Sequence, residues 1–114
     1  STLGFSLNHF TGTIPPSFGN LSALQKLSMS DNNLEGSIPF ELGRLSNLNF
    51  LQLSSSNLSG MVPLPLFNIS SINIFAVAEN QLYGSLPPDL GLTLPKLRGF
   101  YCGTNQFSGP IPPS

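Results

Sequence analysis

Several residue types are scarce or absent, and each shortage narrows the functions that the chain can have. The chain of 114 residues has no tryptophan, one cysteine and one histidine. A single cysteine excludes a disulfide framework within the chain. Charged residues make up only 8% of the sequence, and the net charge is −1. The charge therefore gives no reason to expect a nucleic acid or an anionic membrane as a partner.

Long hydrophobic runs are missing as well. No apolar stretch approaches the about 20 residues that a membrane-spanning helix needs, and the first residues do not read as a secretory signal. Disorder is not expected, because hydrophobic residues reach 39% and disordered chains are poor in them. The sequence begins and stops in mid-pattern, so we expect a piece of a longer protein, whose other parts alone would contact a membrane.

What the sequence does contain is a repeat of 24 to 25 residues, whose cleanest copy runs from Leu21 to Gly43. One column of asparagines, with a single serine, marks the copies: Asn8, Asn32, Ser56, Asn80 and Asn105. Two apolar residues, one position apart, precede each column residue. A glycine follows four residues after it, and an apolar residue with a proline follows the glycine. Periods of this length indicate stacked structural units.

The two apolar residues before each column position predict a short strand. Alternate side chains of a strand point to opposite faces, so both would point inward, as Leu27 and Met29 do in the second copy. One such strand cannot bury its own face, but parallel strands from successive copies can, at about 4.8 Å per step. Glycine and proline then steer the chain back to the next strand.

The repeat resembles the leucine-rich repeat, whose core reads LxxLxLxxNxL, and its tail LxGxIPxxLGxL is similar to the plant-specific class. The resemblance implies an α/β-type repeat solenoid, a right-handed superhelix. A parallel β-sheet of short strands would form the concave face, with turns and 3-10 segments on the return. The predicted units are a partial repeat 1–20, the repeats 21–44, 45–68 and 69–93, and a partial repeat 94–114.

One departure from the 24-residue spacing suggests a narrower resemblance. The segment from Gly91 to Pro95 has one extra residue, with LPPDLG before it and NQFSGPIPPS after it. Together they resemble the immune-receptor branch of plant leucine-rich-repeat receptor kinases. We expect the extra residue to lie in the convex return, where insertions are tolerated.

The outward strand positions predict which residues face a partner. Phe50, Ile74 and Tyr101 are large apolar residues at positions that the pattern exposes, and exposed apolar clusters often mark contact sites. The alternative is that these are scattered surface residues, which are common. The full set of candidate partner-binding residues is Lys26, Phe50, Gln52, Ile74, Ala76, Glu79 and Tyr101.

The column of asparagines has a structural interpretation. An amide side chain offers donors and an acceptor, so a stack of asparagines can satisfy the backbone groups in neighbouring turns. We expect this ladder at Asn8, Asn32, Asn80 and Asn105, with Ser56 as its fifth member. A serine hydroxyl is shorter than the amide, so we expect a water or a local rearrangement at Ser56.

Three Asn-x-Ser triplets are candidate N-glycosylation sites, at Asn20, Asn57 and Asn68. Asn20 and Asn68 share one repeat position on the expected convex return, where a glycan would leave the concave face open. Asn57 lies one residue past the ladder, where a glycan would crowd that face. The alternative is that these triplets are only a consequence of the residues that the repeat pattern contains.

No arrangement of residues indicates catalysis, a metal site or a cofactor. His9 has no partner residue beside it in the repeat, and Cys102 occupies an inward strand position, where we expect an inert core thiol. Glu41 and Asp89 fall in one convex column two repeats apart, and we expect both in solvent without a pocket. Metal sites need clusters of Cys, His or carboxylate. The sequence therefore predicts a binding protein and no enzyme.

The resemblance implies the extracellular recognition module of a plant leucine-rich-repeat receptor-like kinase. Its partners would be a peptide or protein ligand, with a co-receptor ectodomain as a further candidate, and its location the outer face of the plasma membrane. One alternative is a secreted inhibitor similar to polygalacturonase-inhibiting proteins. Another is a structural or ice-binding repeat protein, although its serines are interrupted by Lys26, Phe50 and Gln52. Without polar caps, we expect the segment to associate end to end or to be marginally stable.

Overall fold

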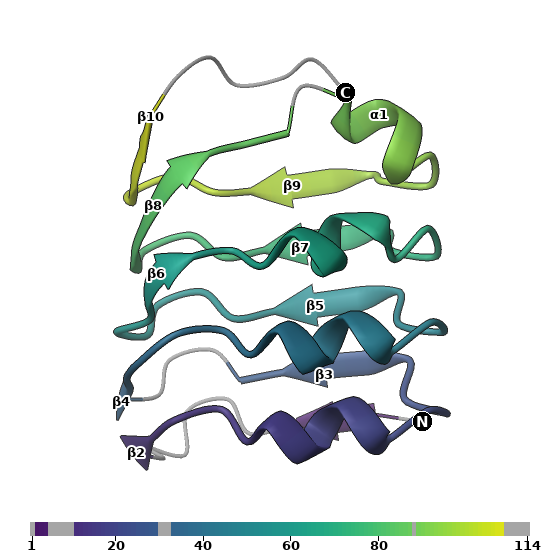
Figure 1. Ribbon diagram of the computed structural model, residues 1–114, viewed down its shortest axis with the longest axis horizontal. Helices are drawn as coiled ribbons and strands as arrows, with labels where there is room; N and C mark the ends of the chain where they lie inside the picture. The colour runs from purple at the N-terminus through teal and green to yellow at the C-terminus, as the bar shows by residue number, and fades with distance from the viewer. Residues whose placement is uncertain (1, 5–10, 30–32, 88, 109–114) are drawn as a thin grey trace.

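The computed structural model describes residues 2–4, 11–29, 33–87 and 89–108. Within these ranges the chain forms a solenoid of stacked coils (Figure 1). Each coil contributes one strand to a five-stranded parallel sheet, in the order β1 (Thr2–Gly4), β3 (Lys26–Ser28), β5 (Phe50–Gln52), β7 (Ile74–Ala76) and β9 (Gly99–Tyr101). We number coils 1 to 5 after these strands. The solenoid, the parallel sheet and the short strands confirm the predicted fold class.

The strands form because their middle residues point into the core. Leu27, Leu51 and Phe75 occupy this position in β3, β5 and β7, and all three are fully buried. They are paired across neighbouring strands, so equivalent residues of successive coils stack on one another. A single short strand could not bury such a side chain, whereas a stack of parallel strands can.

The returns of coils 1 to 3 each use a 3-10 helix on the side of the solenoid opposite the sheet (Figure 1). These are η1 (Pro16–Asn20), η2 (Phe40–Arg44) and η3 (Leu64–Asn68), and each follows a proline at Pro15, Pro39 or Pro63. The three prolines have φ between −61° and −68°, the value that the pyrrolidine ring imposes. The predicted 3-10 segments are therefore confirmed.

Coil 4 accommodates its extra residue by changing the type of helix. In place of a 3-10 helix it has α1 (Leu90–Thr93). Two backbone hydrogen bonds of this segment span four residues, as in an α-helix. Thr93 N donates to Asp89 O at 3.2 Å, and Leu94 N donates to Leu90 O at 2.9 Å. An α-turn holds one more residue than a 3-10 turn, so the 25-residue repeat returns in register with the 24-residue ones.

Strands of the return pair with one another as well, and these pairings were not predicted from the sequence. The strands β6 (Ser59–Met61), β8 (Gln81–Ser85) and β10 (Gln106–Ser108) form a parallel sheet in the order β10-β8-β6. The short strands β2 (Thr11–Gly12) and β4 (Asn33–Leu34) form a second pair. A hydrogen bond of 2.9 Å from Ser59 N to Gly36 O joins coil 3 to coil 2, between these two sets of strands. Backbone hydrogen bonds therefore join neighbouring coils on the return as well.

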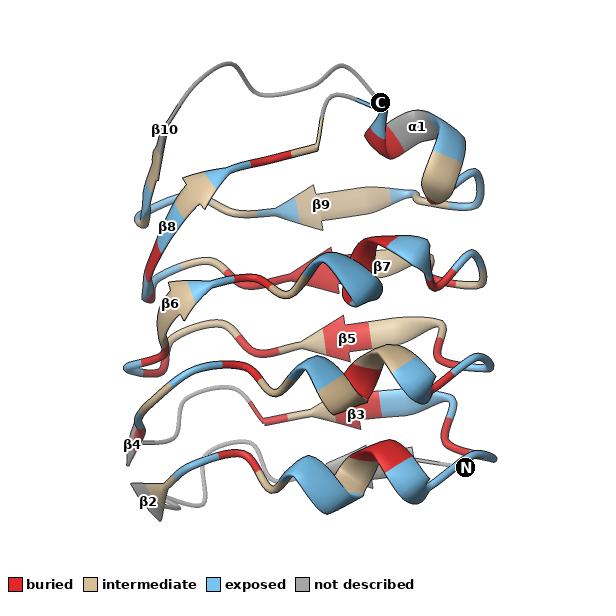
Figure 2. Ribbon diagram, in the orientation of Figure 1, coloured by how far each residue is buried: buried red, intermediate tan, exposed pale blue. Residues whose placement is uncertain are grey.

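The core is one continuous cluster of buried residues. Buried residues occur on both the main-sheet strands and the returns (Figure 2). Phe75 lies in coil 4, where its ring stacks on Phe67 with the centroids 5.3 Å apart and meets Phe100 edge-on at 5.3 Å. The Phe67 ring takes the place that glycine has in other coils, at Gly19 and Gly43. The coils nearest Phe75 are therefore joined by aromatic contacts.

Asn80 shows how the asparagine ladder joins neighbouring coils. Its Oδ1 accepts bonds from the backbone N–H groups of Ser56 at 3.2 Å and Leu58 at 3.1 Å in coil 3. Its Nδ2 donates to the Leu53 carbonyl at 2.9 Å and to Val77 O at 3.1 Å. Asn105 repeats this geometry one coil further on. The amide satisfies buried backbone groups on both coils.

Ser56 makes a weaker link than an asparagine. Its hydroxyl donates to the Met29 carbonyl of coil 2 at 3.5 Å, the outer limit of a hydrogen bond. The side chain thus reaches the neighbouring coil directly, although we expected the hydroxyl to be too short for this. Asn8 and Asn32, the other two ladder positions, lie outside the described residues.

Candidate recognition surface

The concave face is built from the outward residues of the main sheet. Strand register places Lys26, Phe50, Ile74 and Gly99 in one row across β3, β5, β7 and β9, and Ser28, Gln52, Ala76 and Tyr101 in a second row. Neighbours within a row are one strand spacing apart, about 4.8 Å. Side chains from four coils therefore meet on one surface.

Two apolar residues of this face, Ile74 and Tyr101, converge on Gly99. A Cβ on Gly99 would lie 2.9 Å from Cε2 of Tyr101, 3.0 Å from its hydroxyl oxygen and 3.1 Å from Cδ1 of Ile74. The Tyr101 ring therefore folds across Gly99 towards Ile74, while 55% of its surface stays exposed. Phe50 is half-buried on the other side of Ile74. We call Phe50, Ile74 and Tyr101 the concave patch.

Ala76 does not reach the surface, contrary to the expectation that it would face a partner. Its relative exposure is 1%, although its strand position points outward. It lies in register between Gln52 and Tyr101, and its methyl group is too short to rise beside these long side chains. Ala76 is therefore withdrawn as a candidate contact residue.

The polar candidates surround the patch and partly serve the fold. Gln52 is half-buried, and its Oε1 accepts a bond of 3.0 Å from Ser54 N, which shapes the strand exit. Glu79 is exposed, and its carboxylate accepts a hydrogen bond from the Ser55 hydroxyl. Lys26 is exposed at the end of the first row. The surface thus offers an apolar centre with one cation and one anion at its margins.

The three candidate glycosylation residues, Asn20, Asn57 and Asn68, are all exposed. Asn20 and Asn68 end η1 and η3, so they lie on the return and away from the main sheet. Asn57 lies in the turn after β5, where its backbone N–H donates to Leu34 O at 3.0 Å. Access for a modifying enzyme is thus available at each one.

The described residues give little support for chemistry. Cys102 is half-buried against the core, less deeply than expected, and burial raises the pKa of its thiol. Among the residues placed by the structure, no group of three His, Cys, Asp or Glu side chains could hold a metal ion. Within the same ranges, no helix has the length and apolar character of a membrane span. His9 lies outside them.

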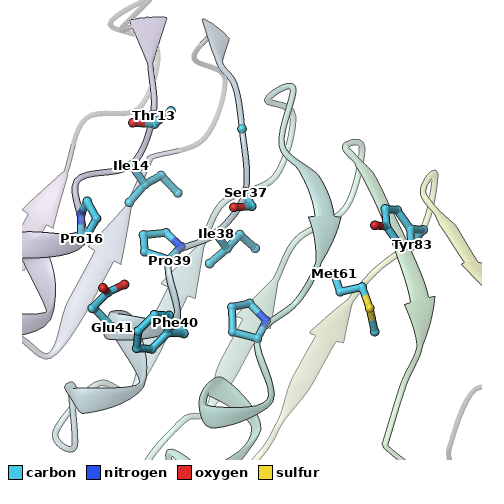
Figure 3. Close-up of a pocket in the computed structure, with 12 residues that line it drawn as sticks. Thr13, Ile14, Pro16, Ser37, Ile38, Pro39, Phe40, Glu41, Met61 and Tyr83 are labelled. Carbon is cyan, nitrogen blue, oxygen red and sulfur yellow. The ribbon is translucent and has the colours of Figure 1, made fainter.

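A groove on the return side was missed, and it corrects one expectation. Glu41 lines a groove of about 760 Å³, whereas we expected a solvated carboxylate without a pocket (Figure 3). Phe40, Met61 and Tyr83 also line it and are more than half exposed. These residues come from three coils at unequal repeat positions, so no single column of the sequence contains all three. The signal available was the pair Phe40 and Leu64, two large apolar residues in one exposed column.

Comparison with known proteins identifies the family. The model for the leucine-rich repeat matches residues 1–21 and 23–45. The chain is also similar to the ectodomain of the Arabidopsis thaliana membrane receptor kinase GASSHO1/SCHENGEN3, with 38% identity over 97% of this chain and a TM-score of 0.92. The chain is a leucine-rich repeat domain of the plant type. No curated protein gave a significant match to this leucine-rich repeat domain.

Two further structures resemble this leucine-rich repeat domain. The BIR2 ectodomain from Arabidopsis thaliana is 36% identical over 96% of the chain, with a TM-score of 0.90. The ectodomain of the Arabidopsis receptor kinase HAESA, solved with an IDA peptide hormone ligand, is 31% identical over 90%, with a TM-score of 0.86. The domain spans 13% of the GASSHO1/SCHENGEN3 structure, 57% of BIR2 and 17% of HAESA.

Proposed function

We propose that this leucine-rich repeat domain is a recognition segment in the extracellular part of a plant receptor-like kinase. It binds a peptide or protein ligand on its concave patch and acts by binding, without catalysis. The observation that carries the proposal is the convergence of Tyr101 and Ile74 on Gly99, which places an exposed aromatic ring near an apolar side chain on the concave face. Exposed aromatic residues on a rigid support are typical binding hot spots.

The similar structures support this proposal. HAESA was solved with the peptide hormone IDA and the co-receptor SERK1, and GASSHO1/SCHENGEN3 with CASPARIAN STRIP INTEGRITY FACTOR 2. We infer the same class of partner here, a peptide or a protein, with a co-receptor ectodomain as a further partner of the full-length protein. We also infer that the domain is on the outer face of the plasma membrane. Membership of the immune-receptor branch stays a prediction.

The paired strands that carry the concave patch explain how the patch would gain affinity for a ligand. Each of the patch residues lies on a strand whose middle residue points into the core, and β5, β7 and β9 are paired in register. A surface held in this way loses little conformational entropy when a ligand binds. Lys26 and Glu79 lie at its margins, where charges influence the rate and the specificity of association more than affinity.

A peptide-selection experiment tests the proposal. A phage-displayed library of random peptides is selected on the domain, and the enriched peptides are titrated against Phe50→Ala, Ile74→Ala and Tyr101→Ala. We expect Tyr101→Ala to raise the Kd roughly thirtyfold or more, because a hot-spot residue contributes at least about 2 kcal/mol. Tyr83→Ala, an exposed tyrosine on the return side, is the matched control and leaves the Kd unchanged. Selected peptides that bind all three patch variants as tightly as the wild type would reject the concave patch.

A further inference from the structure

The groove on the return side lies away from the main sheet and crosses four coils. Pro16 lines it from coil 1, Phe40 from coil 2, Met61 from coil 3 and Tyr83 from coil 4 (Figure 3). The exposed fractions are 59% for Phe40, 55% for Met61 and 52% for Tyr83. A groove that holds three large exposed apolar side chains is a surface that a partner would cover.

The walls of the groove combine apolar, hydroxyl and acidic groups. Three prolines and two aromatic rings line it, and Met61 is turned over Gly84 of the next coil, where a Cβ would lie 2.9 Å from its Cε. The hydroxyl groups of Ser37 and Tyr83 line it as well and can donate hydrogen bonds to a ligand's carbonyl groups. Such a wall suits a ligand that offers carbonyl oxygens and apolar rings.

Charge at the groove has one sign. Glu41 is the charged residue among the twelve lining residues, and it lies beside Phe40 at the end near Pro16 (Figure 3). None of the four Lys and Arg residues of the chain lines the groove. Lys26 is on the main sheet, and Arg44 is at the opposite end of η2. A ligand with a cation at that one end would complement the groove.

The stacking distance of the coils favours one ligand conformation. A polyproline II helix advances about 3.1 Å per residue with three residues per turn, or about 9.3 Å per turn. Two coil steps amount to about 9.6 Å. Phe40 and Tyr83 belong to coils that are two steps apart along the solenoid axis, although they occupy different repeat positions. A ligand that follows this axis would therefore advance by about one turn between the two coils that carry the rings. Grooves lined by aromatic residues are a recurring way to bind proline-rich segments.

We propose that this groove binds a proline-rich segment of a partner protein in the polyproline II conformation, with an arginine or lysine that pairs with Glu41. Proline rings pack against Phe40, Met61 and Tyr83, and the hydroxyl groups of Ser37 and Tyr83 donate to ligand carbonyls. About five residues of such a segment span three coil steps. The site is separate from the concave patch, so one domain can hold both ligands.

The test uses the whole chain and short polyproline peptides with one terminal arginine, one terminal glutamate or neither, followed by fluorescence anisotropy. We expect the arginine peptide to bind most tightly. Phe40→Ala and Tyr83→Ala each raise its Kd roughly tenfold. Glu41→Gln raises the Kd of the arginine peptide severalfold and leaves that of the uncharged peptide unchanged. Tyr101→Ala, an equally exposed tyrosine on the concave face, is the control and changes neither value.

Four results would overturn the proposal. The first is that no polyproline peptide binds, and the second is that the arginine and glutamate peptides bind equally. The third is that Phe40→Ala and Tyr83→Ala bind like the wild type, with folding of each variant verified by circular dichroism. The fourth comes from sedimentation velocity: a dimer that Phe40→Ala and Tyr83→Ala both dissociate would show that a second copy of the chain covers the groove. None of these results depends on the concave patch.

Discussion

At the scale of single residues, buried hydrogen bonds matter more than charge. The side chain of Asn80 satisfies backbone groups of two coils, whereas the exposed Asn57 belongs to a glycosylation triplet and takes no such position. The asparagine column is visible in the sequence because it recurs at a fixed spacing. The burial of Ala76 was not visible in the sequence, because the exposure of Ala76 depends on the lengths of the neighbouring side chains in other coils.

The replacement Asn80→Ala should lower the free energy of unfolding by roughly 3 kcal/mol, because it leaves buried N–H and C=O groups of coils 3 and 4 without partners. Urea denaturation followed by circular dichroism measures the change. Asn57→Ala is the control and should stay within about 0.5 kcal/mol of the wild type, since Asn57 is exposed. Equal effects of the two replacements would show that the ladder does not join the coils.

The thiol of Cys102 should react slowly in the folded domain. Burial raises its pKa above the usual 9.0, so at pH 8 less thiolate is present than in a free cysteine. The rate of alkylation by iodoacetamide should rise on unfolding in urea and, in the folded state, with pH. As pH rises, the thiol of the unfolded state loses its proton at a lower pH than the thiol of the folded state. The contribution of the Cys102 thiol to folding stability is therefore lost as pH rises through the folded pKa. A folded-state rate equal to that in urea would contradict the account.

At the scale of elements, the sequence predicted those features that recur in every copy. The strands of the main sheet and the 3-10 helices have a fixed place in the repeat, so their positions could be read from Leu27 and Pro39 and their equivalents. The pairing of β6, β8 and β10 could not, because it depends on how closely neighbouring returns approach. The groove was missed for a similar reason, since Phe40, Met61 and Tyr83 occupy different positions of the repeat.

The close spacing of the 3-10 helices predicts that replacing Gly19 with a larger residue destabilises the domain. A Cβ on Gly19 in η1 would lie 2.3 Å from the backbone carbonyl oxygen of Glu41 in η2, so Gly19→Ala should force the two helices apart. We expect a loss of roughly 2 kcal/mol in thermal or urea unfolding. Gly103→Ala is the control, because nothing lies within 4 Å of its Cβ position and it should change stability little. A Gly19→Ala domain as stable as the wild type would contradict this packing.

At the scale of the whole molecule, every contact between the described elements joins neighbouring coils. Stability should therefore be distributed along the solenoid and respond locally to mutation. Phe75→Ala removes a ring that contacts Phe67 and Phe100 and should cost roughly 3–5 kcal/mol. Hydrogen exchange should accelerate most in β5, β7 and β9 and least in η1. Uniform acceleration along the chain would indicate one indivisible cooperative unit instead.

The two faces of the molecule carry different candidate sites on one scaffold. The concave patch lies on the main sheet, and the groove lies on the return side, so each can be altered without touching the other. None of the three candidate glycosylation residues is among the members that define either surface, although a glycan on Asn57 would crowd the concave face. Under the two proposals, one segment would hold a ligand and a second protein together.

The concave patch is the central claim, and nuclear magnetic resonance tests it most directly. A peptide selected on the domain is titrated into isotope-labelled protein, and the chemical shifts of methyl and aromatic groups are followed. The account predicts the largest shifts at the Cδ1 methyl of Ile74 and at the rings of Phe50 and Tyr101, with Phe40 and Tyr83 unchanged. Largest shifts at Phe40 and Tyr83, with the concave patch unchanged, would contradict it.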